Sequence, residues 1–361
     1  MRRNPLAWFL IGATLTFALI FPILMRERPF WMYVAVQAFF YAMLASSWAL
    51  LAGYAGQFSF AHMAFMGLAA YTSGIIGREL GATPLTGIIL GVLLAGIVGT
   101  IIGILVLRLR KTYLALFTIA FAEILRLAIN AEVAVTGGPN GLYMVGLVAT
   151  TSYVPYYYLM LGLLLGSLLF MYALAFSRFG LFFRAIREDE EAAAAMGVHV
   201  VRYKILAFVV TSMIAGLAGA VDHHFIGFIA PSEMLIGRMS LVIAMAVIGG
   251  LESLLAAAIG AIFIHFSLEF LQQIPVPSFA IPFLLQYADT LEGVGFGLDL
   301  DSNRIFLNAW RLAGFGLLLM LTLRFWRNGL ISPIIDRLTR KQLLAETVAK
   351  RQLPEGGEAA S

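Results

Sequence analysis

The chain has 361 residues, of which 61% are hydrophobic and 12% are charged, and its mean hydropathy is +0.91. A soluble domain carries about 25% charged residues, so this composition excludes an ordinary soluble protein and indicates an integral membrane protein. The net charge is +4 and cysteine is absent, which excludes a disulfide framework and thiol chemistry.

Long apolar runs predict an all-α, polytopic bundle of about ten membrane spans, because a helix needs about 20 apolar residues to cross the hydrocarbon core. The first run follows Met1-Arg2-Arg3 and is expected to be a retained helix rather than a cleaved leader. The eighth run is too short to cross alone, so we expect a half-helix or one continuous with a neighbour. The predicted spans are 6–25, 30–51, 57–77, 85–107, 113–131, 156–176, 205–222, 239–250, 253–273 and 308–326. Residues 1–326 then form the membrane domain, and 327–361 form a tail whose end is disordered.

The basic residues predict the orientation. With a cytoplasmic N-terminus, 17 of the 24 Lys and Arg residues fall on the cytoplasmic side, including those at 108–111, within 177–204 and in the tail. Both termini are therefore expected in the cytoplasm, with the basic residues of the tail at anionic lipid headgroups. The positive charge then reflects orientation and gives no reason to expect nucleic-acid binding.

The segment GYAGQFSFAH at 53–62 combines glycines with polar side chains where a helix opens. Irregular backbone in a membrane is tolerated only against protein or a watery cavity, which makes this segment a candidate wall of a translocation path. The alternative is that the polar groups only cap the helix, or bond between helices. The candidates are Gly53, Gly56, Gln57, Ser59 and His62.

Two further polar features interrupt the apolar chain. Glu123 and Arg126 lie three residues apart within a predicted span. An unpaired charge there costs about 2.5 kcal/mol or more, so we expect a structural ion pair, with a proton path as the alternative. TGGPNGL has the composition of an external turn, which could contact a partner or be purely structural. The loop residues are Thr136, Gly137, Gly138, Pro139, Asn140 and Gly141.

The polar segment Ser177–Lys204 stands out most from the rest of the chain. Its charges recur at three- and four-residue steps and its alanines are followed by a glycine, which predicts one helix from Arg184 to Met196 that ends at Gly197. Small side chains allow a partner to approach closely, so we expect a docking helix; the alternative is an ordinary charged loop. The residues singled out are Arg184, Arg187, Glu188, Glu191, Ala192, Ala193 and Gly197.

The sequence lacks the motifs of an autonomous enzyme. None of its four lysines follows a glycine, as a phosphate-binding P-loop would require, and neither a nucleophile elbow nor HExxH is present. The acidic and imidazole groups at 222–224 have no suitably spaced further ligand, so we expect no metal site. Any ATP would have to be bound by another subunit.

Six segments between Gly53 and Leu271 together resemble the permease subunit of branched-chain amino acid ABC importers, the Liv type. They are GYAGQFSFAH, LRLRKTYLALFTIAFAEILRL, TGGPNGL, AIREDEEAAAAMGV, RYKILAFVVTSMIAGLAGA and MAVIGGLES. The spacing E-A-A, three residues, G, which begins at Glu191, resembles the loop by which such permeases dock on their ATPases. The external segment 272–309 has no counterpart in that pattern.

The resemblance implies a subunit in a bacterial inner membrane that imports branched-chain or other hydrophobic amino acids by alternating access. The implied partners are two ATPase subunits, a second related permease that completes a heterodimeric pore, and a periplasmic or extracellular substrate-binding protein. Two alternatives stay open from the sequence: an ABC permease for urea or amides, and a stand-alone secondary transporter.

Overall fold

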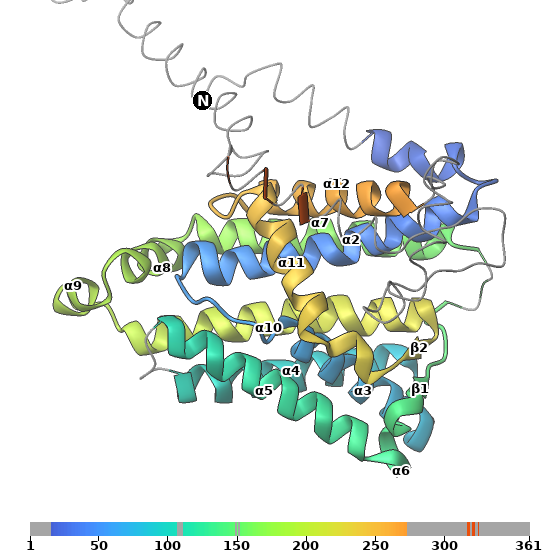
Figure 1. Cartoon of the computed structure of the whole chain (residues 1–361), viewed down its shortest axis with the longest axis horizontal. Coiled ribbons are helices and arrows are strands. Elements are labelled where there is room, and N and C mark those ends of the chain that lie inside the picture. The colour runs from blue at the N-terminus through green and yellow to red at the C-terminus, as the bar shows by residue number, and fades with distance from the viewer. Residues whose placement is uncertain are drawn as a thin grey trace, which may run out of the picture.

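The computed structural model describes residues 16–106, 111–148, 150 and 152–272, and the isolated positions 316, 317, 320, 321 and 324. Long helices lie side by side in Figure 1, with α9 at one end of the bundle and α6, β1 and β2 at the other. The only strands in the described residues, β1 (Leu142–Tyr143) and β2 (Phe228–Ile229), form one antiparallel pair. The chain is therefore a helical bundle, as its composition predicted.

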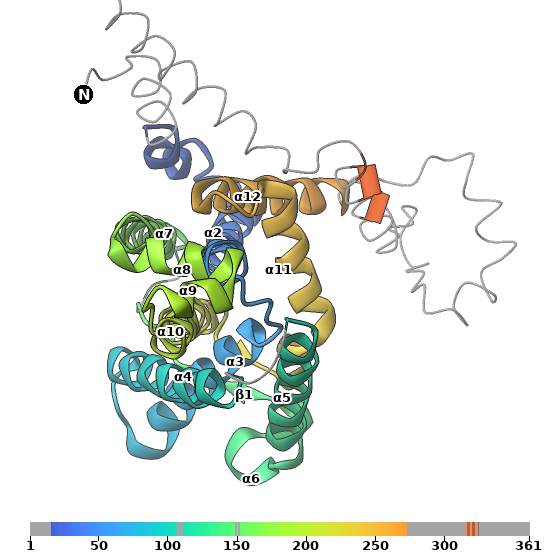
Figure 2. The same ribbon diagram turned by 90° about the vertical axis from the view of Figure 1, so that its left-hand side faces the viewer.

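Helix α2 (Pro29–Ala49) is the centre of the bundle and continues as a π-helical turn, η1 (Leu50–Tyr54). All of its most apolar stretch is buried. Around it pack α7 (Val154–Ala175), α10 (Val200–Ile226), α11 (Ile236–Gly249) and α12 (Leu254–Gln272). Figure 2 shows α2, α7 and α10 nearly end-on and α11 from the side.

Helices α3 (His62–Leu80) and α4 (Pro84–Val106) pack with α10 as a second group. Small residues bring them close: a Cβ at Gly219 would lie 2.8 Å from the backbone oxygen of Met66, and one at Gly91 would lie 2.4 Å from that of Ala69. Close approach of this kind is how membrane helices associate without a hydrophobic driving force between them.

Helix α5 (Lys111–Ala131) lies at the margin of the bundle, beside α11 in Figure 2. Only 17% of its most apolar stretch is buried, the lowest share among the six long apolar helices of the described residues. After α5 the chain forms α6 (Val133–Thr136) and η2 (Gly138–Asn140), and after β2 it forms η3 (Pro231–Met234). Most of one face of α5 is thus left uncovered by the described residues.

The prediction of about ten spans holds only in part. Six described helices are long and apolar enough to cross a membrane, at 29–54, 84–105, 113–131, 154–175, 200–226 and 254–271. The short eighth run is α11, with 14 residues. The predicted span 57–77 begins too early, because residues 55–61 are irregular and α3 starts at His62. Most of the first predicted span, the whole external segment 272–309 except its first residue, and the tail lie outside the described residues.

Candidate functional site

The polar segment forms two helices, not the single helix predicted from Arg184 to Met196. Helix α8 (Arg178–Glu188) ends at Asp189, and α9 (Glu190–Ala195) begins after it. Asp189 is extended, at φ −151° and ψ 111°, and its carboxylate accepts the N–H groups of Glu191 and Ala192 at 2.9 and 3.0 Å. A carboxylate that caps a helix N-terminus competes with continuation of the preceding helix, and this is why the prediction was wrong.

Helix α9 projects from the end of the bundle (Figure 1) but is fastened to it on one side. Lys204 at the start of α10 donates to Glu190 at 2.6 Å, and its own side chain is buried. Ala193 is also buried within this chain, at 5% exposure, whereas Met196 is 85% exposed. Ala193 is therefore not available to a partner, in contrast to its predicted role. The outward face consists of Ala192, Ala194, Ala195 and Met196.

Gly197 ends this segment as predicted. Its φ is +86°, and its amide donates to Ala194 at 2.9 Å. No atom lies within 4 Å of the position of a Cβ, so the glycine is required by its backbone conformation rather than by close packing.

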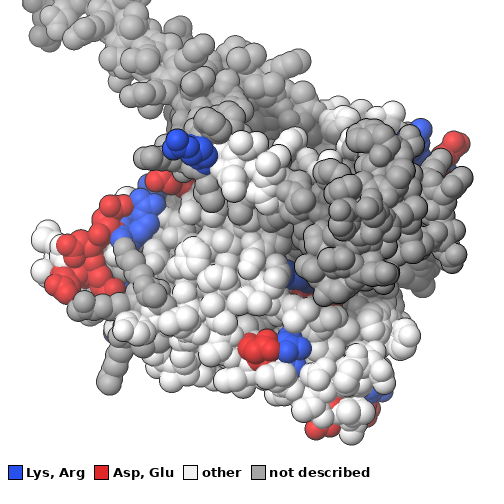
Figure 3. All heavy atoms as spheres, in the orientation of Figure 1, with Lys and Arg blue, Asp and Glu red and all other residues white. Residues whose placement is uncertain are grey.

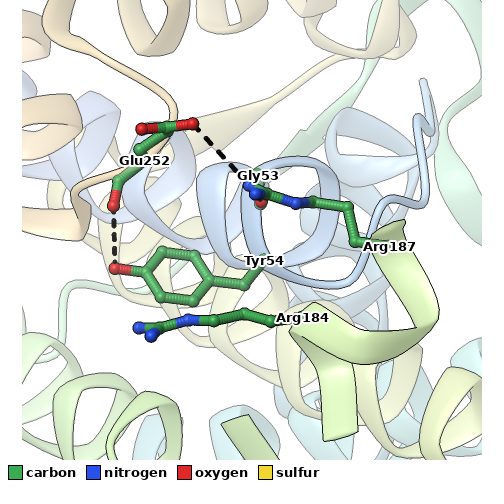
Figure 4. Close-up of a pocket in the computed structure, with 5 residues that line it drawn as sticks. All are labelled: Gly53, Tyr54, Arg184, Arg187 and Glu252. Carbon is green, nitrogen blue, oxygen red and sulfur yellow. Dashed lines mark hydrogen bonds and ion pairs between the residues drawn. The ribbon is translucent and has the colours of Figure 1, made fainter. Parts of the chain in front are cut away.

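Where α8 meets the bundle, a cavity of about 270 Å³ is lined by residues from three parts of the chain. Figure 4 shows Arg184 and Arg187 of α8 reaching toward η1, with Glu252 of the α11–α12 turn on the far side. Arg187 donates to the carbonyl of Gly53 at 2.6 Å, and the Tyr54 hydroxyl donates to the backbone oxygen of Glu252 at 3.0 Å. The Arg184 guanidinium lies 5.1 Å from the Tyr54 ring centre. The contacts of Arg184 and Arg187 around this cavity thus connect α8 to the π-helical turn η1 at the end of α2.

The fit at this junction is tight at two glycines. A Cβ at Gly53 would lie 2.0 Å from the backbone oxygen of Leu251, and one at Gly56 would lie 3.0 Å from the Arg187 side chain. Gly56 also has φ +68°. A movement of α8 would therefore press directly on the backbone of the irregular segment, because protein interiors are close-packed.

The polar candidates of the irregular segment lie inside the protein. Gln57, Ser59 and His62 are all buried, and the Ser59 hydroxyl accepts the amide of Ala61 at 3.2 Å. Trp48 donates to the Ser59 carbonyl at 2.7 Å. Ser59 therefore closes a turn before α3, whose N-cap Ala61 has no side-chain cap bond. Gly53 lines the cavity between α8 and η1.

Glu123 and Arg126 form the expected ion pair on α5. Arg126 Nε and Nη2 donate to the two carboxylate oxygens of Glu123 at 2.9 and 2.5 Å. Figure 3 shows a pair of opposite charges over α5, set apart from the charges at both ends of the molecule. The two side chains thus pair within one helix, as their spacing predicted.

The turn at 136–141 has the backbone that its sequence predicted. Gly137, Gly138 and Gly141 have φ of +77°, +54° and +71°. The Thr136 hydroxyl donates to the carbonyl of Ile129 at 2.7 Å, and a Cβ at Gly141 would lie 2.3 Å from the Ile229 carbonyl of β2. The turn therefore requires these glycines for its own backbone conformation and packing.

Beyond β2, Glu233 of η3 pairs with Arg238 at 2.5 Å. Burial raises the pKa of the Glu233 carboxyl above its usual range, and Arg238 opposes this rise. Sequence reasoning did not single out this pair or Tyr54, and it placed Glu252 near the ninth predicted span without giving it a role. The signal for Glu252 was present, because it is a lone acid that follows an apolar helix within MAVIGGLES.

The six long apolar helices define a multi-pass α-helical membrane protein. Its segment α8–α9 lies between two of them, where a subunit outside the membrane could contact it. The chain belongs to the family described as branched-chain amino acid transport system / permease component, whose model matches residues 30–296.

Two curated relatives are the high-affinity branched-chain amino acid transport system permease proteins LivM of Salmonella typhimurium and Escherichia coli K12. Each is 28% identical over 267 residues, which are 66% of this chain and 63% of the relative, so the chain matches less than two thirds of their length. The probable permease LivM of Methanocaldococcus jannaschii is 26% identical over 160 residues, 41% of this chain and 46% of the relative. PsaBC of Streptococcus pneumoniae, solved in complex with Fab, aligns at 15% identity over 82% of this chain and 92% of that chain, with a TM-score of 0.43.

Proposed function

We propose that the chain is the membrane-spanning subunit of an ATP-binding-cassette importer for branched-chain or other hydrophobic amino acids. Membership of the permease family supports this function, and the polar segment α8–α9 between apolar spans carries it. Transport proceeds by alternating access, and two partner ATPase subunits bind the ATP. The chain itself is a permease component rather than an enzyme.

The ATPase docks on the outward face of α9, with the acidic side chains of Glu188 and Glu191 at the rim. An exposed methionine beside small alanines supports this choice, because Met adapts to a partner surface and small residues admit it closely. Arg184 and Arg187 face the bundle instead, so their role is to carry movement of α8 to η1 and residues 55–61.

The other partners follow from the same proposal. A second, related permease completes a heterodimeric pore, and a periplasmic or extracellular binding protein delivers substrate at the end that carries α6 and η2. The subunit lies in a bacterial inner membrane with both termini in the cytoplasm, as the distribution of 17 of 24 basic residues favours. Reporter fusions after Gly141 and after Gly197 should report opposite sides of the membrane. Reports from the same side would refute this topology.

The function is tested by co-purification of the ATPase with tagged permease variants, together with amino acid uptake by vesicles. Ala195→Trp adds bulk on the exposed face of α9 and should release the ATPase and abolish uptake. Ala131→Trp, on an exposed alanine at the opposite end of the bundle, is the matched control for the ATPase and should retain it. Wild-type permease that never retains an ATPase would refute the proposed function. Thermal shift of the binding protein encoded nearby then identifies the substrate.

A further inference from the structure

The exposed face of α5 carries the charged side chains of Glu123 and Arg126 at a depth where the membrane contains no water. Glu123 lies twelve residues beyond Lys111 and eight before Ala131, which places it about 18 Å and 12 Å from the helix ends. Its side chain is 45% exposed and that of Arg126 is 18% exposed. A hydrocarbon core about 30 Å thick would therefore enclose both charges.

Contact between lipid tails and the charged face of α5 is energetically unfavourable. Each charged side chain near the middle of a membrane costs about 2.5–3.5 kcal/mol or more, and such residues almost always face protein or a water-filled path. Pairing lowers the cost, but 45% of the Glu123 side chain is left uncovered by the described part of the chain. The face of α5 that bears the pair is thus expected to line the space between this subunit and its partner permease.

A cavity of about 120 Å³ opens beside the pair. Glu123 is its one charged lining residue, and the other lining side chains are apolar, with two methionines among them. They come from the irregular segment, α5, η3 and α11, and include Phe60, Ile119, Met234, Ile236 and Met239. Apart from Glu123 the lining is apolar, which suits an aliphatic side chain.

We propose that Glu123, Arg126 and this cavity form a binding subsite for a zwitterionic α-amino acid with a short aliphatic side chain. This inference rests on the proposed function and names the group that recognises its substrate within the membrane. The Glu123 carboxylate binds the substrate ammonium. The Arg126 guanidinium binds the substrate carboxylate, because its planar arrangement of N–H donors matches the two carboxylate oxygens. The aliphatic side chain enters the cavity, where flexible methionines adapt to its shape.

Charge balance favours replacement of the Glu123–Arg126 ion pair by pairs with the substrate. The ion pair and the zwitterion are each neutral, so exchange of one Arg126–Glu123 pair for two pairs with substrate leaves no uncompensated charge in the membrane at either stage. When substrate leaves, the two side chains pair again. A structural pair and a substrate site are therefore two states of the same residues.

The test measures ligand binding without the binding protein. The complete complex of both permeases and the ATPases is reconstituted in nanodiscs, and binding of radiolabelled L-leucine is measured by scintillation proximity. The competitors are 3-methylbutylamine, which lacks the carboxylate, and 4-methylpentanoate, which lacks the ammonium. Unlabelled L-leucine should compete at least tenfold better than either.

Three variants connect the binding to the residues. Glu123→Gln and the charge-reversed double variant Glu123→Arg with Arg126→Glu should each lower leucine affinity at least tenfold. The double variant keeps an ion pair, so it controls for folding. Ala122→Leu fills the cavity and should lower affinity for leucine more than for alanine. Glu132→Gln, a carboxylate change just beyond the end of α5, should bind like wild type.

The outcomes separate this inference from the proposed function. ATPase retention by the wild-type complex tests the function and is independent of Glu123. Unchanged leucine affinity in Glu123→Gln and in the double variant overturns the subsite, even when the ATPase is retained. Equal competition by the amine, the acid and leucine overturns it as well.

Discussion

Replacement of Arg187 by methionine should loosen the junction between α8 and the π-helical end of α2. Methionine keeps most of the aliphatic stem that packs beside Gly56 but removes the guanidinium. The change therefore deletes the hydrogen bond to the Gly53 carbonyl at 2.6 Å and the ion pair with Glu188 at 2.7 Å. Arg187 also approaches Glu252 at 4.0 Å.

The magnitude comes almost wholly from the bond to Gly53. A hydrogen bond from a charged donor contributes about 1.5–3 kcal/mol. The side chains of Glu188 and Glu252 are 71% and 75% exposed, so solvent screens both ion pairs, and exposed pairs contribute about 0–1 kcal/mol. We expect Arg187→Met to lower the free energy of unfolding by about 2 kcal/mol, which for a chain of 361 residues corresponds to a shift of the midpoint of about 3 °C.

The assay is thermal unfolding of the purified subunit, followed by uptake in the assembled complex. Arg178→Met is the matched control, because Arg178 is an exposed arginine of the same helix with no ion pair among the described residues. Uptake should fall in Arg187→Met although the ATPase is retained, because α8 no longer holds η1. Equal midpoints and equal uptake in the two variants would refute the reasoning.

Three further predictions follow from single contacts. Asp189→Ala removes both capping bonds of α9 and should cost about 0.5–2 kcal/mol, seen as faster proteolysis of residues 189–197, whereas unchanged proteolysis would contradict the cap. Gly219→Ala places a Cβ 2.8 Å from a backbone oxygen of α3 and should destabilise by about 1–3 kcal/mol, while Gly166→Ala, with open space around it, should not; equal midpoints would refute this packing. Arg238→Gln removes the group that opposes the raised pKa of Glu233, so the folded state binds a proton that the unfolded carboxyl, with a pKa of about 4.3, releases. The free energy of unfolding that Arg238→Gln loses relative to wild type should therefore grow as pH rises from about 5 to 8. A loss that does not change with pH would contradict the pairing of Arg238 with Glu233.

The sequence by itself determined the class of protein and much of the local structure. Its hydropathy predicted a polytopic helical bundle, and the six long spans confirm this class. The turn at Gly137–Gly141 and the stop at Gly197 were predictable because a positive φ depends on the local residue type. The pair Glu123–Arg126 was predictable because residues three apart on a helix share one face.

Tertiary structure decided which side chains meet, because these contacts join residues far apart in the chain. Arg187 lies 134 residues from Gly53, and no periodicity indicates that the arginine faces inward rather than toward a partner. Ala193 is buried although its alanine neighbours are exposed, because Lys204 draws α9 against α10. The break at Asp189 is a competition between a local cap and helix continuation. Its outcome depends on where Lys204 holds the following turn, which the sequence of the segment alone does not specify.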